Sequence, residues 1–197
     1  MSTYVRKITL GNNGDVFVGG NFHARVWTGK VFVDVYDLAM FSSLKGWLPL
    51  AGNSQLLCLQ SPNCPVGVYS LAWDNTKNIL YIGGTFDYLD NTPITHGLCQ
   101  WTSVGGIENF PGGGVTNNPS AVYSQVVSLH FSADSESLYV AGSFLVAGNI
   151  NCENIAVWRR KSGSWMCLYE ANIAISVINT MFFDANRAVL YIAGISS

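Results

Sequence analysis

Leu80-Tyr-Ile-Gly-Gly-Thr-Phe86 is one of four copies of a short sequence that decides the fold. The others are Val16-Phe-Val-Gly-Gly-Asn-Phe22, Leu138-Tyr-Val-Ala-Gly-Ser-Phe144 and Leu190-Tyr-Ile-Ala-Gly-Ile-Ser196, so that successive copies begin 64, 58 and 52 residues apart. Each copy is rich in β-branched and aromatic residues, which favour strands, and contains Gly-Gly or Ala-Gly. A small pair in a strand marks a place where neighbouring backbone comes close. The repeat therefore predicts four equivalent buried strands.

An earlier apolar segment precedes each copy. These segments are Ile8–Leu10, Val68–Trp73, Val126–Phe131 and Val177–Phe183, and the last three lead into polar turns that contain Asp74, Asp134 and Asp184. Asp favours tight reversals because its side chain accepts hydrogen bonds from nearby backbone N–H groups. Each segment and the copy that follows it are thus predicted to form a β-hairpin.

Third and fourth apolar segments follow the glycines. The third segments are Leu38–Phe41, Leu98–Trp101 and Ile155–Trp158, and the fourth are Trp47–Leu50, Ile107–Phe110 and Trp165–Leu168. Four short antiparallel strands, repeated at about 50 residues, are typical of the blades of a β-propeller. A single sheet cannot bury both of its faces, but sheets stacked around an axis can. We therefore predict an all-β fold of four-stranded blades.

The chain is predicted to hold about three and a half blades, within a single partial propeller that spans residues 1–197. The predicted bounds are about 4–52, 66–111 and 124–170 for the three blades and 175–197 for the half blade. A propeller needs at least about four blades, so this ring is incomplete. The last hairpin would end on an apolar, unpaired edge at Tyr191–Gly194, which soluble proteins avoid. We expect a continuation of the chain, a partner protein or a second copy to cover it and close the propeller.

The pattern resembles the kelch repeat, in which an apolar strand ends in a double glycine and two spaced aromatic residues follow. Gly19-Gly20 and Gly83-Gly84 match it, Ala141-Gly142 and Ala193-Gly194 are near variants, and Phe41 with Trp47 and Trp158 with Trp165 occupy the aromatic positions. The form of the third unit, Leu138–Phe144 followed by Asn154–Trp158, more closely resembles the divergent kelch-like repeats of fungal cortical marker proteins. It departs from the pattern in the second unit, which lacks the late Trp. The resemblance implies a β-propeller and says little about function, because propellers host unrelated activities.

The composition excludes several classes of protein. Hydrophobic residues make up 49% of the chain, which argues against disorder, and the net charge of -2 argues against nucleic acid as a partner. The longest uncharged run, residues 48–73, is broken by prolines, so no membrane insertion is expected. No signal peptide is visible near Arg6 and Lys7. We therefore predict a protein of the cytoplasm or of a large assembly, and charged residues that make up only 11% of the chain would suit a large assembly such as a capsid.

The five cysteines include no CxxC pair. Cys99 and Cys167 lie in apolar runs, where a reduced thiol acts as a small hydrophobic residue. Cys58 and Cys64 could close a short loop in an oxidising compartment, but the reduced, cytosolic state is the preferred interpretation.

The sequence offers no catalytic group of residues, no cofactor site and no metal site. His23, His96 and His130 lack partners at metal-ligand spacing and are interpreted as loop or channel residues. The Asp residues that recur in the hairpin turns could form a ring of carboxylates or calcium sites, but turn chemistry explains them better, and they are Asp15, Asp74, Asp134 and Asp184. The basic run Arg159–Lys161 is interpreted as a solvated hairpin tip.

Two sets of residues are singled out. Structural roles in the repeat are expected for Gly20, Gly84, Gly142, Gly194, Trp101, Trp158 and Trp165. Aromatic residues in loops outside the repeat are the candidate contacts to a ligand or partner, and these are Trp27, Tyr88 and Tyr123.

The preferred function is that of a non-catalytic propeller for protein–protein interaction or structural assembly. The alternative is a carbohydrate-binding module that uses the loop aromatics, since aromatic rings can form platforms for sugars. A hydrolase or oxidase is the least favoured class, because no catalytic set of residues is present.

Overall fold

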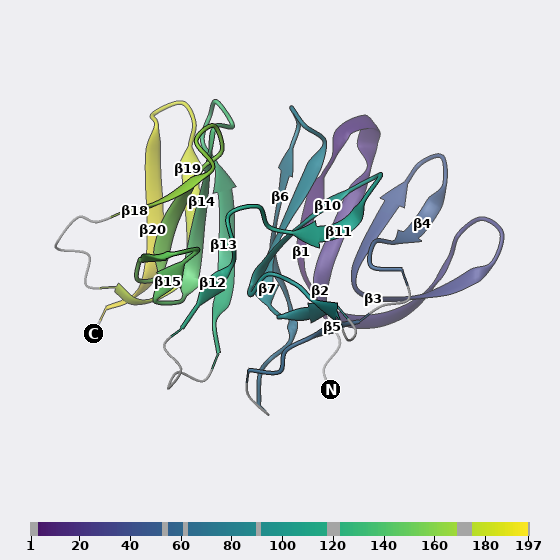
Figure 1. The fold of residues 1–197 in the computed structure, drawn as a ribbon. Helices are drawn as coiled ribbons and strands as arrows, with labels where there is room; N and C mark the ends of the chain where they lie inside the picture. Colours follow the sequence, from purple (N-terminus) through teal and green to yellow (C-terminus); the bar gives the residue numbers. More distant parts are fainter. Residues whose placement is uncertain are drawn as a thin grey trace.

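The computed structural model describes residues 4–52, 55–60, 63–89, 92–117, 123–168 and 175–196. These residues form antiparallel β-sheets, and the only helical element among them is the short 3-10 turn η1 (Asn12–Gly14). The expectation of an all-β fold is confirmed. Figure 1 shows the larger sheets side by side, in the order of the sequence from right to left.

Four sheets carry the repeat, and we number them in chain order. Sheet 1 consists of β1 (Tyr4–Leu10), β2 (Val16–Trp27), β3 (Phe32–Ser42) and β4 (Gly46–Pro49). Sheet 2 consists of β6 (Gly67–Asp74), β7 (Ile79–Thr85), β10 (Leu98–Thr102) and β11 (Gly106–Asn109). Sheet 3 consists of β13 (Gln125–Phe131), β14 (Ser137–Ser143), β17 (Ile155–Arg159) and β18 (Ser164–Cys167), and sheet 4 is the hairpin of β19 (Ile175–Asp184) and β20 (Val189–Ser196).

Two small three-stranded sheets lie in the connections. One consists of β5 (Leu56–Leu57), β8 (Tyr88–Leu89) and β9 (Thr92–Pro93), and the other of β12 (Val115–Thr116), β15 (Val146–Ala147) and β16 (Ile150–Asn151). The sequence did not predict them, because strands of two residues carry no detectable periodicity.

The first strand of every large sheet contains a β-bulge at the same repeat position. At this position the pairing with the second strand skips one residue, and the skipped residues are Arg6, Tyr69, Val127 and Asn179. β19 has a second register shift, between Ile175 and Val177. A bulge bends a strand and increases its twist. The registers on either side of the bulge make Leu10, Trp73, Phe131 and Phe183 equivalent, and likewise Ile8, Leu71, Leu129 and Met181.

The hydrophobic core lies between consecutive sheets. One buried cluster joins sheets 1 and 2 around Phe17 and Leu71, a second joins sheets 2 and 3 around Tyr81 and Leu129, and a third joins sheets 3 and 4 around Met181. The first strands β1, β6, β13 and β19 contact one another in sequence. We call the face of each sheet that points toward the following sheet its forward face, and the opposite one its backward face.

Two predicted loops are strands. The β2–β3 hairpin extends well beyond the repeat, and Trp27 is the last residue of β2 rather than a loop residue. Tyr88 is likewise paired in β8, opposite Leu57 and Pro93. In Figure 1 the long β2–β3 hairpin of sheet 1 curves to the right, away from sheets 2 to 4.

Candidate interaction surface

Adjacent sheets meet through one aromatic contact that occurs three times. An aromatic residue on the forward face of a second strand packs against an aromatic residue near the end of the first strand of the next sheet. The ring centroids are 5.0 Å apart for Phe17 and Trp73, 5.5 Å for Tyr81 and Phe131, and 5.3 Å for Tyr139 and Phe183. The interface between consecutive sheets is therefore built from repeat positions.

A hydrogen bond between first strands also recurs. Ser70 Oγ accepts a hydrogen bond from the backbone N–H of Leu129 at 2.9 Å, and Ser128 Oγ accepts one from the N–H of Met181 at 3.3 Å. The two serines are equivalent in the repeat, as are the two donors. Thr180 occupies the same position in sheet 4, where its side chain is exposed.

The backward face of sheet 1 exposes residues whose counterparts are buried. Ile8 and Leu10 are 58% and 68% exposed, and Val5 is also exposed. The residues equivalent to Ile8, namely Leu71, Leu129 and Met181, are all buried. This face thus displays the apolar pattern of an internal interface with no sheet on it among the described residues.

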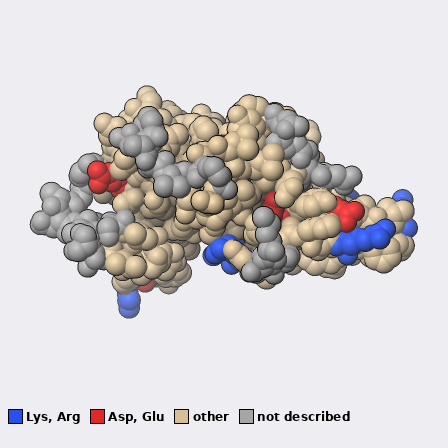
Figure 2. All heavy atoms as spheres, turned by 90° about the horizontal axis from the view of Figure 1, so that it is seen from below, with Lys and Arg blue, Asp and Glu red and all other residues tan. Residues whose placement is uncertain are grey.

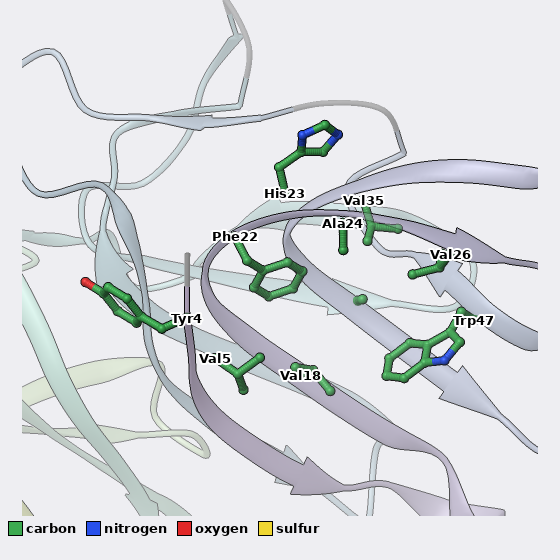
Figure 3. A pocket seen from close by; sticks show the side chains of 10 residues that line it. Tyr4, Val5, Val18, Phe22, His23, Ala24, Val26, Val35 and Trp47 are labelled. Carbon is green, nitrogen blue, oxygen red and sulfur yellow. The ribbon is translucent and has the colours of Figure 1, made fainter. Parts of the chain in front are cut away.

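An apolar pocket of about 260 Å³ opens on the same face. Figure 3 shows Phe22 and Trp47 on opposite sides of it, with Val5 and Val18 below. Val18 and Ala39 belong to the repeat and lie opposite each other in β2 and β3. The pocket can accept an apolar side chain from whatever packs on sheet 1.

The forward face of sheet 4 is the matching exposed end. Tyr191 and Phe182 are 49% and 59% exposed, and Val189 is exposed as well. Phe17 and Tyr81, the equivalents of Tyr191 in sheets 1 and 2, are buried against the following sheet. Among the described residues, β20 pairs with β19 alone, so its outer edge carries no strand.

A second cavity, of about 580 Å³, lies where the first strands converge. The bulged residues Arg6, Tyr69, Val127 and Asn179 all line it. The Arg6 guanidinium stacks over the Tyr69 ring, with the Arg6 Cζ atom 4.1 Å from the ring centroid. The bulges therefore place one residue per sheet at a common cavity.

Charged side chains form no continuous patch on the face of the molecule that Figure 2 shows. On this face Lys, Arg, Asp and Glu form small separate groups.

The exposed pair His23 and Asp34 lies on the β2–β3 hairpin, with 2.9 Å between His23 Nε2 and Asp34 Oδ1, and the His23 ring stacks on Tyr36. Burial lowers the pKa of His130, and nearby Lys7 adds to this effect.

The three candidate contact residues lie on separate elements. Trp27 is half-exposed near the tip of the β2–β3 hairpin, with its ring 5.1 Å from that of Phe32. Tyr88 and Tyr123 are partly buried, and the Tyr123 carbonyl accepts a hydrogen bond from Asn117. No aromatic contact joins the three among the described residues, so they do not form one platform.

The repeat glycines lie where backbone passes close by. A Cβ atom at Gly20, Gly84 or Gly142 would meet the carbonyl oxygen of Tyr4, Gly67 or Gln125, respectively. Gly194 lies opposite Ile178, as Gly84 lies opposite Val68. Each of these carbonyl oxygens belongs to the first strand of the same sheet. Because the clash is with backbone, it cannot be relieved by the movement of a flexible side chain.

The repeat tryptophans are not equally enclosed. Trp158 and Trp165 are buried against Phe110, with ring centroids 5.4 and 5.6 Å from it. Trp101 is only partly buried, although its ring contacts Phe17 at 5.6 Å. The second sheet lacks a late Trp beside Trp101, which leaves that indole less covered.

The recurring Asp residues do serve the turns. The Oδ1 atoms of Asp74, Asp134 and Asp184 accept hydrogen bonds from the backbone N–H groups two residues later, at 2.9, 3.0 and 2.9 Å. The prediction of turn chemistry is confirmed for these three. Sequence reasoning missed that Asp74 is fully buried and pairs with Arg160 of sheet 3, so Arg160 is not a solvated tip residue.

The cysteine pairing corrects the sequence interpretation. Cys152 and Cys167 form a disulfide, and Cys58 and Cys64 form another. The expectation that Cys167 is a reduced thiol is therefore wrong, and it failed because Cys152 belongs to a connection whose path the sequence did not reveal. Cys99 is a buried thiol, and burial raises its pKa.

Neither a metal-binding group of side chains nor a long apolar helix is present among the described residues. No group of three or more His, Cys, Asp or Glu side chains is placed to hold a metal ion there. In the same residues no helix has the length and apolar character that crossing a membrane requires.

Comparison with known proteins yields a likeness of fold. No protein-family model and no curated protein matches the chain. Among solved structures, the extracellular domain of a putative hybrid two-component system from B. thetaiotaomicron is similar, with a TM-score of 0.58 at 13% sequence identity. The match covers 95% of this chain and 20% of that structure, so the chain spans about a fifth of its length.

Proposed function

We propose that the chain is a non-catalytic assembly module of the β-propeller type, whose sheets are blades and whose two end faces bind protein. The constant strand order, the common bulge and the repeated aromatic contact support the view of sheets 1 to 3 as blades and sheet 4 as half of a fourth.

The observation that carries the proposal is the exposure of interface positions at both ends. Tyr191 on the forward face of sheet 4 and Ile8 on the backward face of sheet 1 are exposed, while their equivalents between sheets 1, 2 and 3 are buried. Contiguous exposed apolar surface of this kind marks an interaction site. The low charge of the chain, 11% of residues, would suit a surface that is buried in an assembly.

Sedimentation velocity of the purified chain at micromolar concentrations tests this function. The wild type should self-associate, and Phe182→Ser combined with Tyr191→Ser should shift it toward monomer. Leu44→Ser combined with Val104→Ser is the matched control, because both residues are almost fully exposed at turns away from the end faces. A wild-type chain that stays monomeric and soluble would overturn the proposal.

Carbohydrate binding is the second candidate, and the exposed ring pair Trp27 and Phe32 is the observation that favours it. Aromatic rings at an exposed hairpin tip can stack on sugars, and the Arg25 guanidinium lies 5.6 Å from the centroid of the Phe32 ring. A glycan array that compares the wild type with Trp27→Ala tests it. Loss of a wild-type signal in the variant supports this function, and the absence of any glycan signal excludes it.

A further inference from the structure

We propose that the outer edge of β20 binds one antiparallel polypeptide strand of defined sequence pattern. The pattern is Asn, Gly or Asp, then Leu or Ile, then a small residue, any residue and an aromatic residue. This inference rests on the proposed function, and it names what binds the outer edge of β20 rather than what packs on the forward face of sheet 4. Its basis is that the chain contains the same strand, in the same register, three times.

The register is identical in the three complete sheets. The Leu or Ile lies opposite the first small residue of the repeat, in the pairs Gly19 with Leu38, Gly83 with Leu98 and Ala141 with Ile155. The small residue lies opposite the aliphatic residue before it, in the pairs Val18 with Ala39, Ile82 with Cys99 and Val140 with Ala156. The aromatic residue lies opposite the start of the repeat, in the pairs Val16 with Phe41, Leu80 with Trp101 and Leu138 with Trp158.

The first residue of the pattern has a left-handed backbone in all three sheets. The φ angles of Asp37, Gly97 and Asn154 are 57°, 67° and 63°. Gly, Asn and Asp are the residues that tolerate this conformation best. The carbonyl oxygens of Gly97 and Asn154 accept hydrogen bonds from the repeat glycines Gly84 and Gly142, at 3.0 and 2.9 Å. The first residue of the pattern is therefore set by backbone geometry.

Packing fixes the next two positions. Leu38 and Leu98 are fully buried on the forward faces of sheets 1 and 2. The small residues Ala39, Cys99 and Ala156 are buried as well, and Cys99 and Ala156 pack toward the preceding sheet. A large side chain at this position would force the sheets apart.

β20 presents the same partner positions, and among the described residues no strand pairs with its outer edge. Leu190, Ile192, Ala193 and Gly194 are equivalent to Leu138, Val140, Ala141 and Gly142. An incoming strand in the common register would place its aromatic residue opposite Leu190, its small residue opposite Ile192 and its Leu or Ile opposite Ala193. Its first residue would accept a hydrogen bond from the N–H of Gly194, as Asn154 does from Gly142.

A second copy of the chain is not the occupant. Its strands of this pattern are β3, β10 and β17, and each already lies between two other strands of its own sheet. The occupant is therefore a polypeptide segment that brings the pattern in extended form, and main-chain hydrogen bonds with alternating side-chain contacts would hold it.

A peptide with the sequence of residues 153–159, capped at both ends and fluorescently labelled, is the probe for the intact chain. In the control peptide, Ile155→Trp and Trp158→Ile exchange the two large residues. Fluorescence anisotropy should show that the unaltered peptide binds at least about tenfold more tightly than the control, because only the unaltered peptide keeps the common register. The two peptides have the same composition, so a general apolar affinity would not separate them.

Backbone methylation of the peptide tests the edge itself without altering the protein. In sheet 3 the carbonyl oxygen of Asn154 accepts a hydrogen bond from the N–H of Gly142. Hydrogen-bonded pairs alternate along an antiparallel ladder. The N–H groups of Ala156 and Trp158 therefore face β14, and the N–H of Val157 faces away from it. N-methylation at Ala156 or Trp158 should abolish binding to β20, and N-methylation at Val157 should leave it.

The outcomes separate the inference from the proposed function. Equal binding of both peptides, or binding that ignores the methylation pattern, overturns the strand proposal. A chain that self-associates but binds neither peptide also overturns it, while the assembly function stands. A monomeric chain that binds no peptide overturns both.

Discussion

The guanidinium of Arg160 lies on the buried carboxylate of Asp74, so that the tip of sheet 3 closes over the hairpin turn of sheet 2. Arg160 also donates a hydrogen bond to Thr76 Oγ1 at 3.2 Å, and its Cζ atom lies 5.3 Å from the centroid of the Phe131 ring. Asp74 is fully buried and accepts backbone hydrogen bonds from its own turn. One residue therefore both shapes a turn and joins two sheets.

Arg160→Met should lower the free energy of unfolding by about 3 kcal/mol, because it leaves the Asp74 carboxylate buried without its cation. Urea denaturation of the variant measures the loss. Lys161→Met is the matched control, since Lys161 is exposed at the same turn, and it should change stability little. If both variants lose the same amount, the ion pair is not what joins the sheets. Adding Asp74→Asn to Arg160→Met should recover part of the loss.

The repeat positions could be predicted from the sequence because their physical constraint is local. An apolar strand that contains Gly-Gly must pass close to other backbone, and Gly20, Gly84 and Gly142 do lie against carbonyl oxygens. Arg160 could not be found in this way. Its partner Asp74 lies 86 residues earlier, and nothing in the run Arg159–Lys161 distinguishes a solvated turn from one that reaches a neighbouring sheet.

Gly84→Val should destabilise the protein by about 2 kcal/mol or more, because a side chain there meets the carbonyl oxygen of Gly67 and the ring of Phe86. Thermal unfolding followed by circular dichroism measures the change. Gly106→Asn is a suitable comparison: Gly106 has open space around it, and Asn tolerates its φ of 72°. Unchanged melting of Gly84→Val would show that the repeat glycine is not needed for close approach.

Trp158→Ala should cost about 3–5 kcal/mol, since the indole is buried between sheets 2 and 3 among Phe110, Trp165 and Gly112. Trp27→Ala removes an indole that is half-exposed and should cost far less. Urea denaturation measures the two losses of stability. Acrylamide quenching gives an independent check, because a buried indole is poorly quenched, and the fluorescence that Trp158→Ala removes should belong to the poorly quenched part of the signal. Similar losses of stability in the two variants would contradict the position of Trp158 in the core.

The candidate surface was harder to predict than the fold. Tyr191 could be placed on an open edge by counting strands, and the structure does leave that residue exposed. Trp27 was chosen as a loop aromatic, but it ends a strand that continues the β2–β3 hairpin. The extension has no counterpart in the other units, so the repeat pattern gave no register for it. The pocket beside Trp47 depends on this extension and was equally invisible.

The pH dependence of stability should reveal Asp37, because burial raises its pKa from 3.8 to about 6 against the opposing hydrogen bonds from the backbone N–H groups of Phe22 and Leu56. Between about pH 4 and 6 the folded state binds a proton that the unfolded state has released. The contribution of this group therefore favours folding at low pH and declines as the pH rises through about 6. Asp37→Asn should remove that dependence and stabilise the protein at pH 7.5 by about 1–3 kcal/mol, with little effect at pH 4.

Asn suits this test because it tolerates the left-handed φ of 57° at position 37 and keeps an oxygen that can accept the N–H of Phe22. Asp34→Asn is the control, since Asp34 is half-exposed on the same strand. Thermal unfolding from pH 4 to 8 measures both variants. A stability difference between Asp37→Asn and the wild type that does not vary with pH would show that the carboxyl group is not the cause.

Thiol titration decides between the reduced state preferred from the sequence and the two disulfides of the structure. Denatured, unreduced protein should show one reactive thiol, that of Cys99, and reduced protein should show all five cysteines. In the native state even Cys99 should be unreactive, because it is buried and its pKa is raised. Five reactive thiols in denatured, unreduced protein purified under oxidising conditions would contradict both pairs and favour a reducing compartment.

The two disulfides should contribute unequally to stability. Cys152 and Cys167 are 15 residues apart, and Cys58 and Cys64 only 6, so the first closes the longer loop and restricts the unfolded chain more. Replacing Cys152 and Cys167 by Ser should cost about 3 kcal/mol, and replacing Cys58 and Cys64 about 2 kcal/mol, on the chain-entropy model. Because Cys152 is also buried beside Trp158 and Trp165, its loss leaves a poorly filled core and should add to the difference. Urea denaturation of the two double variants under oxidising conditions measures it, and a larger loss from the Cys58 and Cys64 pair would contradict this order.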